Sequence, residues 1–470
     1  MTLPNPRQAP MDTPEHDILG IHGLRTVDVK THPDFPNQIA FVVEPEFDTV
    51  PEYCCNTEYD QVTRNGTREI RYRDLPYYGK YAELILHRQR VRCNLCGAFR
   101  YMGVLGVHPD HRMTWRAYEY LGRSGVRRTF AEVAREMGIS EGTVRKVFKS
   151  YSQEKLKEAC IDSQPEVLGL DEKHLNGQYR CVLGNIKDRT LIDMLPNRHK
   201  ATLDRYFASL LGKEEIRVVC TDMYDPYRQV AREHLTQAAV VVDRFHVVNL
   251  ATTALNNVRR RVGKRLSDKD RARLSHAREL LMQRGGGKTD EARAQLEEWF
   301  SMAPILSRAY WAKEHFANLY QVAKTRAEAE AYYDEWVRTI PKGLSKDFKK
   351  LQDSVHEWRN EILAYFDHPY TTGYVEGVNN MLSTMQRMGA GYAFEQIRAK
   401  ALLAQSSHKL TPVRFRRMII DFFGSGDDEP MLNLGVSIDW LQQILDTPGA
   451  FESLDPFDRE TEDQWCLSAT

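Results

Sequence analysis

The spacing of apolar residues changes several times along the chain, and each change predicts a different kind of structure. Between residues 163 and 250, short β-branched runs alternate with amphipathic stretches, which predicts strands flanked by helices. Tyr179 to Ile186 and Thr190 to Leu195 have the pattern of a hairpin, and short buried strands are predicted at Ile216 to Cys220 and Ala238 to Val242. This part of the chain therefore predicts a mixed α/β sheet with helices on its faces.

A long helical pattern follows. Residues 251–370 are rich in Ala, Leu, Glu, Lys, Arg and Trp at helical spacing, with one break at Gly285-Gly286-Gly287. We interpret them as an all-helical insertion. Residues 371–420 then return to the core as its final helices, beginning with a glycine-marked turn and a helix that carries an early carboxylate.

Two smaller domains are predicted before the core. Residues 1–105 hold strand-like runs at Ile39 to Val43 and Ala82 to Leu86, which indicates a β-rich domain. Within residues 106–162, a helix closed by Gly138 is followed by Ser140, a residue type that caps the next helix. This pattern predicts a helix-turn-helix, although a plain helical hairpin in a bundle would have the same pattern.

Charge is strongly segregated in a chain whose net charge is zero. Residues 61–150 contain 18 basic and 8 acidic side chains, and residues 244–288 contain 12 basic and 3 acidic. Residues 421–470 form an acidic tail with 1 basic and 12 acidic side chains. Two basic blocks favour a polyanionic partner such as DNA, while solvated helix faces are the alternative interpretation of each block alone.

The cysteines indicate a metal site rather than disulfides. The sequence has no apolar run long enough for a membrane span and no signal-peptide core, so a cytoplasmic protein is expected, nucleoid-associated if the basic blocks bind DNA. Cys93 and Cys96 have the spacing of a zinc knuckle, but the preceding pair, Cys54 and Cys55, is adjacent. Either one of that pair ligates Zn²⁺ together with a histidine (His87, His108 or His111), or the site is degenerate.

Three carboxylates carry the candidate chemistry. Asp171 and Asp222 each follow a buried strand run, and Glu376 lies early in a late helix. Such an arrangement suits two Mg²⁺ or Mn²⁺ ions that act on a phosphodiester. Each acid also has an ordinary interpretation as a turn or helix-start residue. Asp243 is a fourth candidate that could instead cap a helix, and His246 could polarise water, contact DNA or be structural.

These residues resemble the bacterial insertion-sequence transposases of the ISL-three family, a branch of the DDE, RNase H-like superfamily. The resemblance spans roughly residues 15–410 and is most specific at Val242-Asp243-Arg244-Phe245-His246 and at Val375-Glu376-Gly377-Val378-Asn379-Asn380 with Gln386-Arg387 and Gly391-Tyr392. Two departures exist. The family's first cysteine pair is usually spaced by two residues, whereas here it is Cys54-Cys55, and Thr372-Gly373 stands where the family often has Asn-Gly.

The resemblance implies an RNase H-like core interrupted by the helical insertion, with Asp171, Asp222 and Glu376 as the catalytic, Mg²⁺-binding acids. It implies cleavage at the inverted repeats that end the element, strand transfer into target double-stranded DNA, and a homodimer in the synaptic complex. An inactive DNA-binding regulator and a nuclease acting on other nucleic acid are the alternatives. Basic residues of the helix-turn-helix, of the insertion and of the last core helices are the candidate DNA contacts: Arg145, Lys146, Lys149, Arg259, Arg260, Arg261, Lys264, Arg265 and Arg387.

Overall fold

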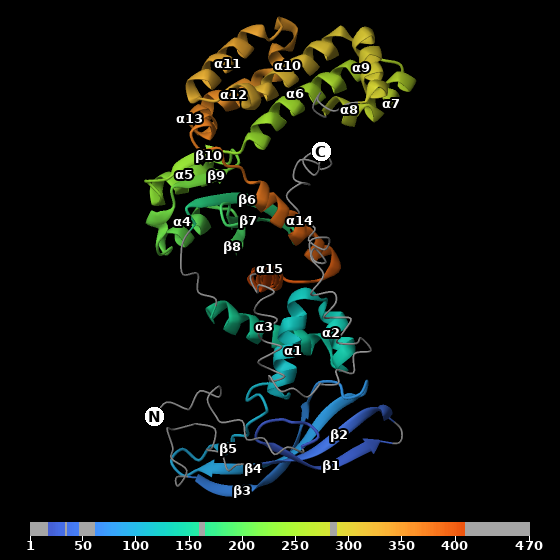
Figure 1. The fold of residues 1–470 in the computed structure, drawn as a ribbon, viewed down its shortest axis with the longest axis vertical. Helices are drawn as coiled ribbons and strands as arrows, with labels where there is room; N and C mark the ends of the chain where they lie inside the picture. Colours follow the sequence, from blue (N-terminus) through green and yellow to red (C-terminus); the bar gives the residue numbers. More distant parts are fainter. Residues whose placement is uncertain (1–16, 33–34, 47–61, 159–164, 283–288, 409–470) are drawn as a thin grey trace, which may run out of the picture.

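The computed structural model describes residues 17–32, 35–46, 62–158, 165–282 and 289–408. The predictions for Cys54, Cys55, the triple glycine at 285–287 and the acidic tail lie outside these residues. Figure 1 shows one sheet at one end of the molecule, a second sheet in the middle and a helical insertion at the other end. No helix within the described ranges is both long and apolar enough to cross a membrane.

The first sheet has the strand order β1-β2-β4-β3, with β5 paired to β4 (Figure 1). Its strands are β1 (Leu24–His32), β2 (Phe35–Pro45), β3 (Val62–Arg73), β4 (Tyr81–Cys93) and β5 (Phe99–Tyr101). The two predicted strand runs lie inside β2 and β4. The pattern of apolar residues does not predict β3, because most of its side chains are exposed and polar. It is a strand because its backbone pairs with β4 in antiparallel register.

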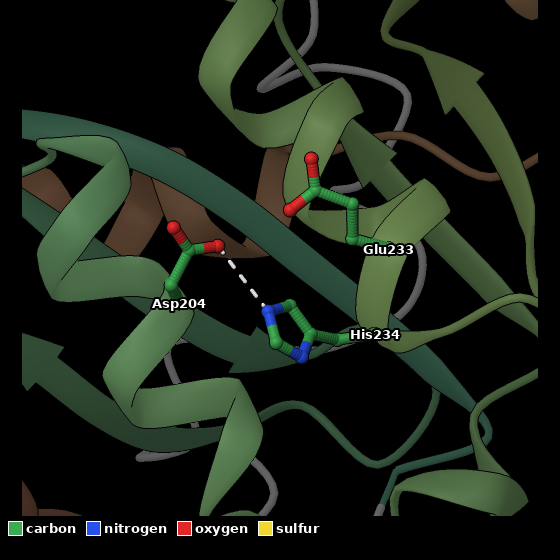
Figure 2. A group of neighbouring side chains, drawn as sticks. All are labelled: Asp204, Glu233 and His234. Atoms are coloured by element: carbon green, nitrogen blue, oxygen red, sulfur yellow. Dashed lines mark hydrogen bonds and ion pairs between the residues drawn. The ribbon is translucent and has the colours of Figure 1, made fainter.

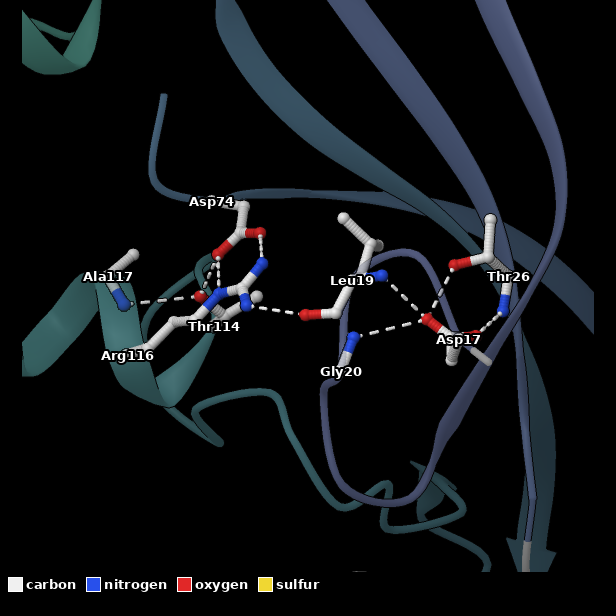
Figure 3. Close-up of polar contacts among 8 residues, drawn as sticks. All are labelled: Asp17, Leu19, Gly20, Thr26, Asp74, Thr114, Arg116 and Ala117. Carbon is white, nitrogen blue, oxygen red and sulfur yellow. Dashed lines mark hydrogen bonds and ion pairs between the residues drawn. The ribbon is translucent and has the colours of Figure 1, made fainter. Parts of the chain in front are cut away.

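A buried ion pair joins this sheet to the first helix, α1 (Trp115–Arg127), as Figure 3 shows. Asp74 is only 1% exposed, and it accepts hydrogen bonds from the Thr114 hydroxyl at 2.6 Å and from Arg116 Nε at 2.9 Å. Thr114 also caps α1, and Arg116 donates to the carbonyl of Leu19 at 2.7 Å. Because the buried charge of Asp74 is paired and hydrogen-bonded, the contact fixes the sheet against the helices.

Two further helices, α2 (Phe130–Met137) and α3 (Glu141–Glu158), follow with a short turn between them. Thr129 and Glu132 form a capping box at the start of α2, and Gly138 ends the helix with φ 61°, a backbone angle that glycine adopts easily. The Ser140 hydroxyl accepts from the N–H of Thr143 at 3.1 Å at the start of α3. The helix ends predicted at Gly138 and Ser140 are therefore correct.

The second sheet has the strand order β10-β9-β6-β7-β8. Its strands are β6 (Val167–Leu175), β7 (Gln178–Asn185), β8 (Thr190–Leu195), β9 (Val218–Thr221) and β10 (Ala239–Val242). β6, β7 and β8 are antiparallel, as the predicted hairpin requires, whereas β9 and β10 run parallel to β6. Helices α4 (Lys200–Ala208) and α5 (Asp225–His234) pack on this sheet through one apolar core.

The helical insertion begins with α6 (Arg244–Gly263), which starts directly after β10 and therefore belongs to both the core and the insertion. The rest of the described insertion is mainly helical, as predicted, with Trp299, Trp336 and Phe348 in its buried core. The remaining helices are α7 (Asp268–His276), α8 (Arg278–Met282), α9 (Asp290–Met302), α10 (Pro304–Val322), α11 (Arg326–Thr339), α12 (Ser345–Glu357) and α13 (Arg359–Leu363), with 3-10 turns at Lys342–Leu344 and Ala364–Phe366.

The chain then returns to the second sheet as α14 (Gly373–Met388) and α15 (Phe394–His408). Both helices share one apolar core with α1, α2 and α3. The buried Lys400 Nζ donates to the carbonyls of Gly125 and Arg128, the latter at 2.8 Å, and Tyr392 accepts from the N–H of Phe130 at 2.9 Å. The three-helix unit is thus packed against the second sheet's own helices.

Candidate active site

Three aspartates lie in one row across adjacent parallel strands. Leu170 of β6 pairs with Thr221 of β9, and Thr221 pairs with Val242 of β10. Asp171, Asp222 and Asp243 directly follow these three residues in the chain. Because neighbouring strands are about 4.8 Å apart, this register brings the three residues side by side where the parallel pairing ends.

The register also corrects one detail of the sequence interpretation. Asp222 and Asp243 follow the last residue of their strands, as expected. Asp171, however, does not end its strand: β6 continues to Leu175, and Asp171 pairs with Val182 of β7. It lies level with the end of β9 because β9 is the shorter partner.

Glu376 reaches this row from the first turn of α14, as predicted. The start of α14 packs against two glycines, Gly169 of β6 and Gly184 of β7, which are partners in the register of these strands. A Cβ on either glycine would lie 2.8–2.9 Å from the Val375 side chain. Small residues at this pair therefore let α14 approach the sheet closely enough to bring Glu376 to the aspartates.

The acids influence one another electrostatically. Burial raises the pKa of Asp222 to about 8, with further contributions from the nearby charges of Glu172 and Asp171. Burial also raises the pKa of Asp171, and it raises that of Glu376, to which the charges of Asp243 and Asp171 add. Carboxylates that raise each other's pKa in this way are stabilised in their charged form by a bound cation.

The tightest group of ligand atoms is not the predicted triad. Asp243, His246 and Glu376 have ligand atoms that all lie within 4.8 Å of one another, and His246 Nε2 is 3.9 Å from Glu376 Oε1. Asp243 is fully buried, and its carboxylate already accepts from Phe245 N at 2.8 Å, Thr372 N at 2.8 Å and the Thr372 hydroxyl. It caps α6, which was the alternative interpretation, and most of its acceptor capacity is used.

Several residues of the site had no role in the sequence interpretation. Asn379 Nδ2 donates to Asp171 Oδ2 at 2.8 Å and lies three residues after Glu376, which places both on one face of α14. Glu172 pairs with Arg198 at 2.5 Å and lies beside Asp222. The spacing of Glu376 and Asn379 was visible in the sequence. The partners of Glu172 were not, because they come from other elements.

The donor set fits a hard divalent cation. Asp222 Oδ1, Glu172 Oε2, Asn379 Oδ1 and His246 Nε2 are buried, and none of them has a hydrogen-bond partner among the described residues. Unpaired buried acceptors are costly, and three of these four are oxygens, the ligand type that Mg²⁺ and Mn²⁺ prefer. The side chain of Glu376 is 47% exposed, so the site is open to solvent at this residue.

A second group with metal-like spacing lies between α4 and α5, formed by Asp204, Glu233 and His234 (Figure 2). Here Lys200 supplies the positive charge. Its Nζ lies 3.0 Å from Asp204 and 2.6 Å from Glu233, and His234 Nε2 lies 3.2 Å from Asp204. We interpret this group as an ion-pair network that joins the two helices.

In the part of the chain that the structure describes, the predicted zinc knuckle forms a turn. Cys93 is buried at the end of β4 and Cys96 is exposed, with Gly97 closing the turn by a 2.9 Å bond to the Cys93 carbonyl. None of the three candidate histidines joins these cysteines in a metal-sized group within the described ranges. His108 and His111 pack instead against Tyr118 of α1.

The predicted DNA contacts separate into engaged and exposed side chains. Arg145 is half-buried and donates to Glu141 at 3.0 Å and to Gln396 at 2.9 Å, and it packs on the ring of Tyr392. Arg261 pairs with Asp347 at 2.6 Å. The remaining candidates divide by exposure: Arg259 is half-buried, and Lys146, Lys149, Arg260, Lys264, Arg265 and Arg387 are exposed.

Comparison with known proteins supports the family resemblance. Residues 168–401 match the family model of the ISL-three group, whose description is "Transposase". The chain is 25% identical over 348 residues to the transposase for insertion sequence element IS1001 of Bordetella parapertussis, covering 72% of this chain and 84% of that relative. It is 26% identical over 272 residues to the transposase for IS1557 of Mycobacterium tuberculosis, covering 52% of this chain and 61% of the relative.

Proposed function

Because the chain belongs to the ISL-three family of insertion-sequence transposases, we propose that it is a DNA transposase that binds the inverted repeats of its own element and catalyses strand cleavage and strand transfer. The observation that carries the proposal is the row of Asp171, Asp222 and Asp243 with Glu376 brought beside it. An inactive regulator is not favoured, because the relatives are named as transposases and the acids that the reaction needs are gathered together.

The core is best described as RNase H-like. The support is the strand order: the first strand, β6, lies in the centre, with the antiparallel β7 and β8 on one side and the parallel β9 and β10 on the other. In such a mixed sheet the central strand and its parallel neighbour end at the same edge. Acids on β6 and after β9 therefore share one site, whatever their separation in sequence.

Asp171, Asp222 and Glu376 would hold the metal ions, and His246 and Glu172 lie within the same site. Two divalent cations, when bound, activate the attacking oxygen and stabilise the leaving 3′ oxygen of the phosphodiester. The protein's own contribution is to fix the ligands. Asn379 holds Asp171 through a 2.8 Å bond, and Arg198 restrains Glu172.

Asp243 is better explained as a positioning residue than as a ligand. It ties the first turn of α6 to Thr372, the residue before α14, and α14 carries Glu376. This connection also couples the helical insertion to the active site, since α6 continues into the insertion.

We further propose that α2 and α3 contact DNA at the element ends, with the exposed Lys146 and Lys149 on phosphates. Arg145 is reassigned to holding α3 against α15, because its guanidinium is already occupied by Glu141 and Gln396. A zinc site at Cys93 and Cys96 stays a prediction.

The test is cleavage of a duplex that carries the element's end and its flank, with and without Mg²⁺ or Mn²⁺. We expect a nick at the element boundary that requires the metal and is lost in Asp222→Asn, while binding of the duplex is retained. Metal-independent cutting, or cutting by Asp222→Asn at the wild-type rate, would contradict the proposed chemistry.

A further inference from the structure

A basic hollow lies in the helical insertion, between the end of α6 and α7. Its volume is about 370 Å³. No acidic residue lines it. The lining residues are Arg259, Arg260, Gly263, Lys264, Arg271, Leu274 and Ser275.

The positive charge in the hollow is poorly compensated. Among the described residues, Arg260 and Lys264 have no ion-pair partner, and Arg271 pairs only with Asp268 at 3.0 Å, whose side chain is 95% exposed. Burial, followed by the charges of Arg278 and Arg260, lowers the pKa of Arg259. A hollow whose cations repel one another is relieved by an anion.

Two of these cations are already held in place. Arg259 Nε donates to Asn256 Oδ1 at 3.0 Å, and Arg271 Nε donates to the carbonyl of Gly263 at 3.2 Å. Arginine side chains fixed in this way present their remaining N–H groups in a planar fork, the geometry that matches phosphate oxygens. Arg261, the neighbour of Arg260, turns away to Asp347 and takes no part.

The position of the hollow relative to the active site follows from α6. His246, in the first turn of α6, lies at the active site, and Arg260 and Lys264 lie 14 and 18 residues further along. At about 1.5 Å per residue, the hollow is roughly 21–27 Å from the acids along one helix. Phosphates of one B-DNA strand follow each other at about 3.4 Å along the duplex, so this distance corresponds to about six to eight base pairs.

We propose that this hollow binds the phosphate backbone of double-stranded DNA about six to eight base pairs from the phosphodiester that is cut. The inference rests on the proposed transposase function and adds a second site of contact with the same duplex. Because α6 begins at the active site and ends at the hollow, one helix sets the distance between the phosphodiester that is cut and the phosphates that the hollow binds. The hollow contacts no bases in this account, so its contribution is independent of sequence.

The test compares two triple variants of the full-length chain with equal loss of charge. The first replaces Arg260, Lys264 and Arg271 by Ala in the hollow, where all three are exposed. The matched control replaces Lys346, Lys349 and Lys350 by Ala on α12 of the same insertion. The single substitution Lys264→Gln serves as the milder variant and repeats the comparison if the triple variant melts at a lower temperature than the control.

Each protein is titrated with a long duplex that extends about 20 base pairs to either side of the cleavage point, and with short duplexes that end about four base pairs from it on one side or the other. The hollow variant is expected to bind the long duplex at least about tenfold more weakly, and its salt slope should fall by about two to three. On the short duplex that lacks the base pairs facing the hollow, the hollow variant and the control variant should bind with equal affinity. The single variant should show about one third of the change in slope.

Equal affinities of the hollow and control variants for the long duplex would overturn the proposal. If the hollow variant lost the same affinity for all the duplexes, the predicted distance between the hollow and the cleavage point would be overturned, and with it the role of α6. Whether the wild-type protein cuts DNA is measured separately on the same duplexes, so failure of the hollow and failure of the transposase function give different results.

Discussion

The carboxylate of Asp243 accepts a hydrogen bond from the backbone N–H of Thr372 at 2.8 Å, which ties the start of α6 to the start of α14. These residues are 129 positions apart and enclose the entire helical insertion. The helix that carries Glu376 and the helical insertion are therefore fixed to the same carboxylate.

Asp243→Ala should destabilise the protein by about 2–4 kcal/mol, because three buried hydrogen bonds to one charge are lost. Asp243→Asn keeps an acceptor and should lose less. Thermal denaturation measures the stability, and calorimetric Mn²⁺ titration measures the metal site, with the exposed Asp268→Ala as control. If Asp243→Asn lost Mn²⁺ binding at unchanged stability, Asp243 would be a metal ligand rather than a positioning residue.

Gly184→Ala should push α14 away from the sheet, because the added Cβ would lie 2.9 Å from Val375. We expect a loss of about 1–3 kcal/mol in the free energy of unfolding, together with slower DNA cleavage. The control is Gly377→Ala on α14, where the new Cβ meets no atom within 4 Å and helix propensity favours alanine. Equal cleavage rates for the two variants would show that the packing of α14 on Gly169 and Gly184 does not determine the position of Glu376.

Lys400 should give the protein a pH-dependent stability. Burial, followed by the charge of Arg145, lowers the pKa of Lys400 to about 8 from its ordinary value of 10.5. Between these values the unfolded chain binds more protons than the folded protein, so the free energy of unfolding rises with pH across this window, by at most about 3 kcal/mol.

Lys400→Met should remove that rise. Denaturant unfolding gives the free energy of unfolding of both proteins at pH 7.5 and pH 10. The change between the two pH values is then compared between wild type and variant, so that the titration of all other groups cancels. Parallel changes in wild type and variant would mean that Lys400 is charged in the folded protein throughout this range.

Lys146 and Lys149 should affect DNA binding, whereas Arg145 should affect stability. Replacing both lysines by Ala removes two exposed cations of α3 and should lower the salt slope of DNA binding by about two. Arg145→Ala breaks the contacts to Glu141 and Gln396 and should lower the melting temperature instead. A variant of Arg145 that folds normally yet binds the element's ends poorly would restore it as a DNA contact.

The sequence predicted the elements well where the signal was local. Strand runs before Asp222 and Asp243, the glycine turn before Glu376 and the helical spacing of the insertion all depend on neighbours within a few residues. β3 was missed because its stability comes from pairing with β4 and not from its own polar side chains.

The site could be predicted only in part for the same reason. Asn379 meets Asp171 across 208 residues, and Arg145 meets Gln396 across 251. Nothing local distinguishes a basic residue that faces solvent from one that another helix will cover. Thus Arg145 was interpreted as a DNA contact, and Asn379 had no role until the fold brought it to the aspartate.

The central claim is that the row of acids cuts DNA, and single-turnover cleavage of an element-end duplex by Asp171→Asn, Asp222→Asn and Glu376→Gln tests it most directly. Each variant should bind the duplex nearly as tightly as the wild type and cut it at least about a hundredfold more slowly in saturating Mg²⁺, because an ionised metal ligand is lost. Wild-type cleavage rates in any of the three would contradict the role assigned to that residue, and wild-type rates in all three would contradict the active site described above.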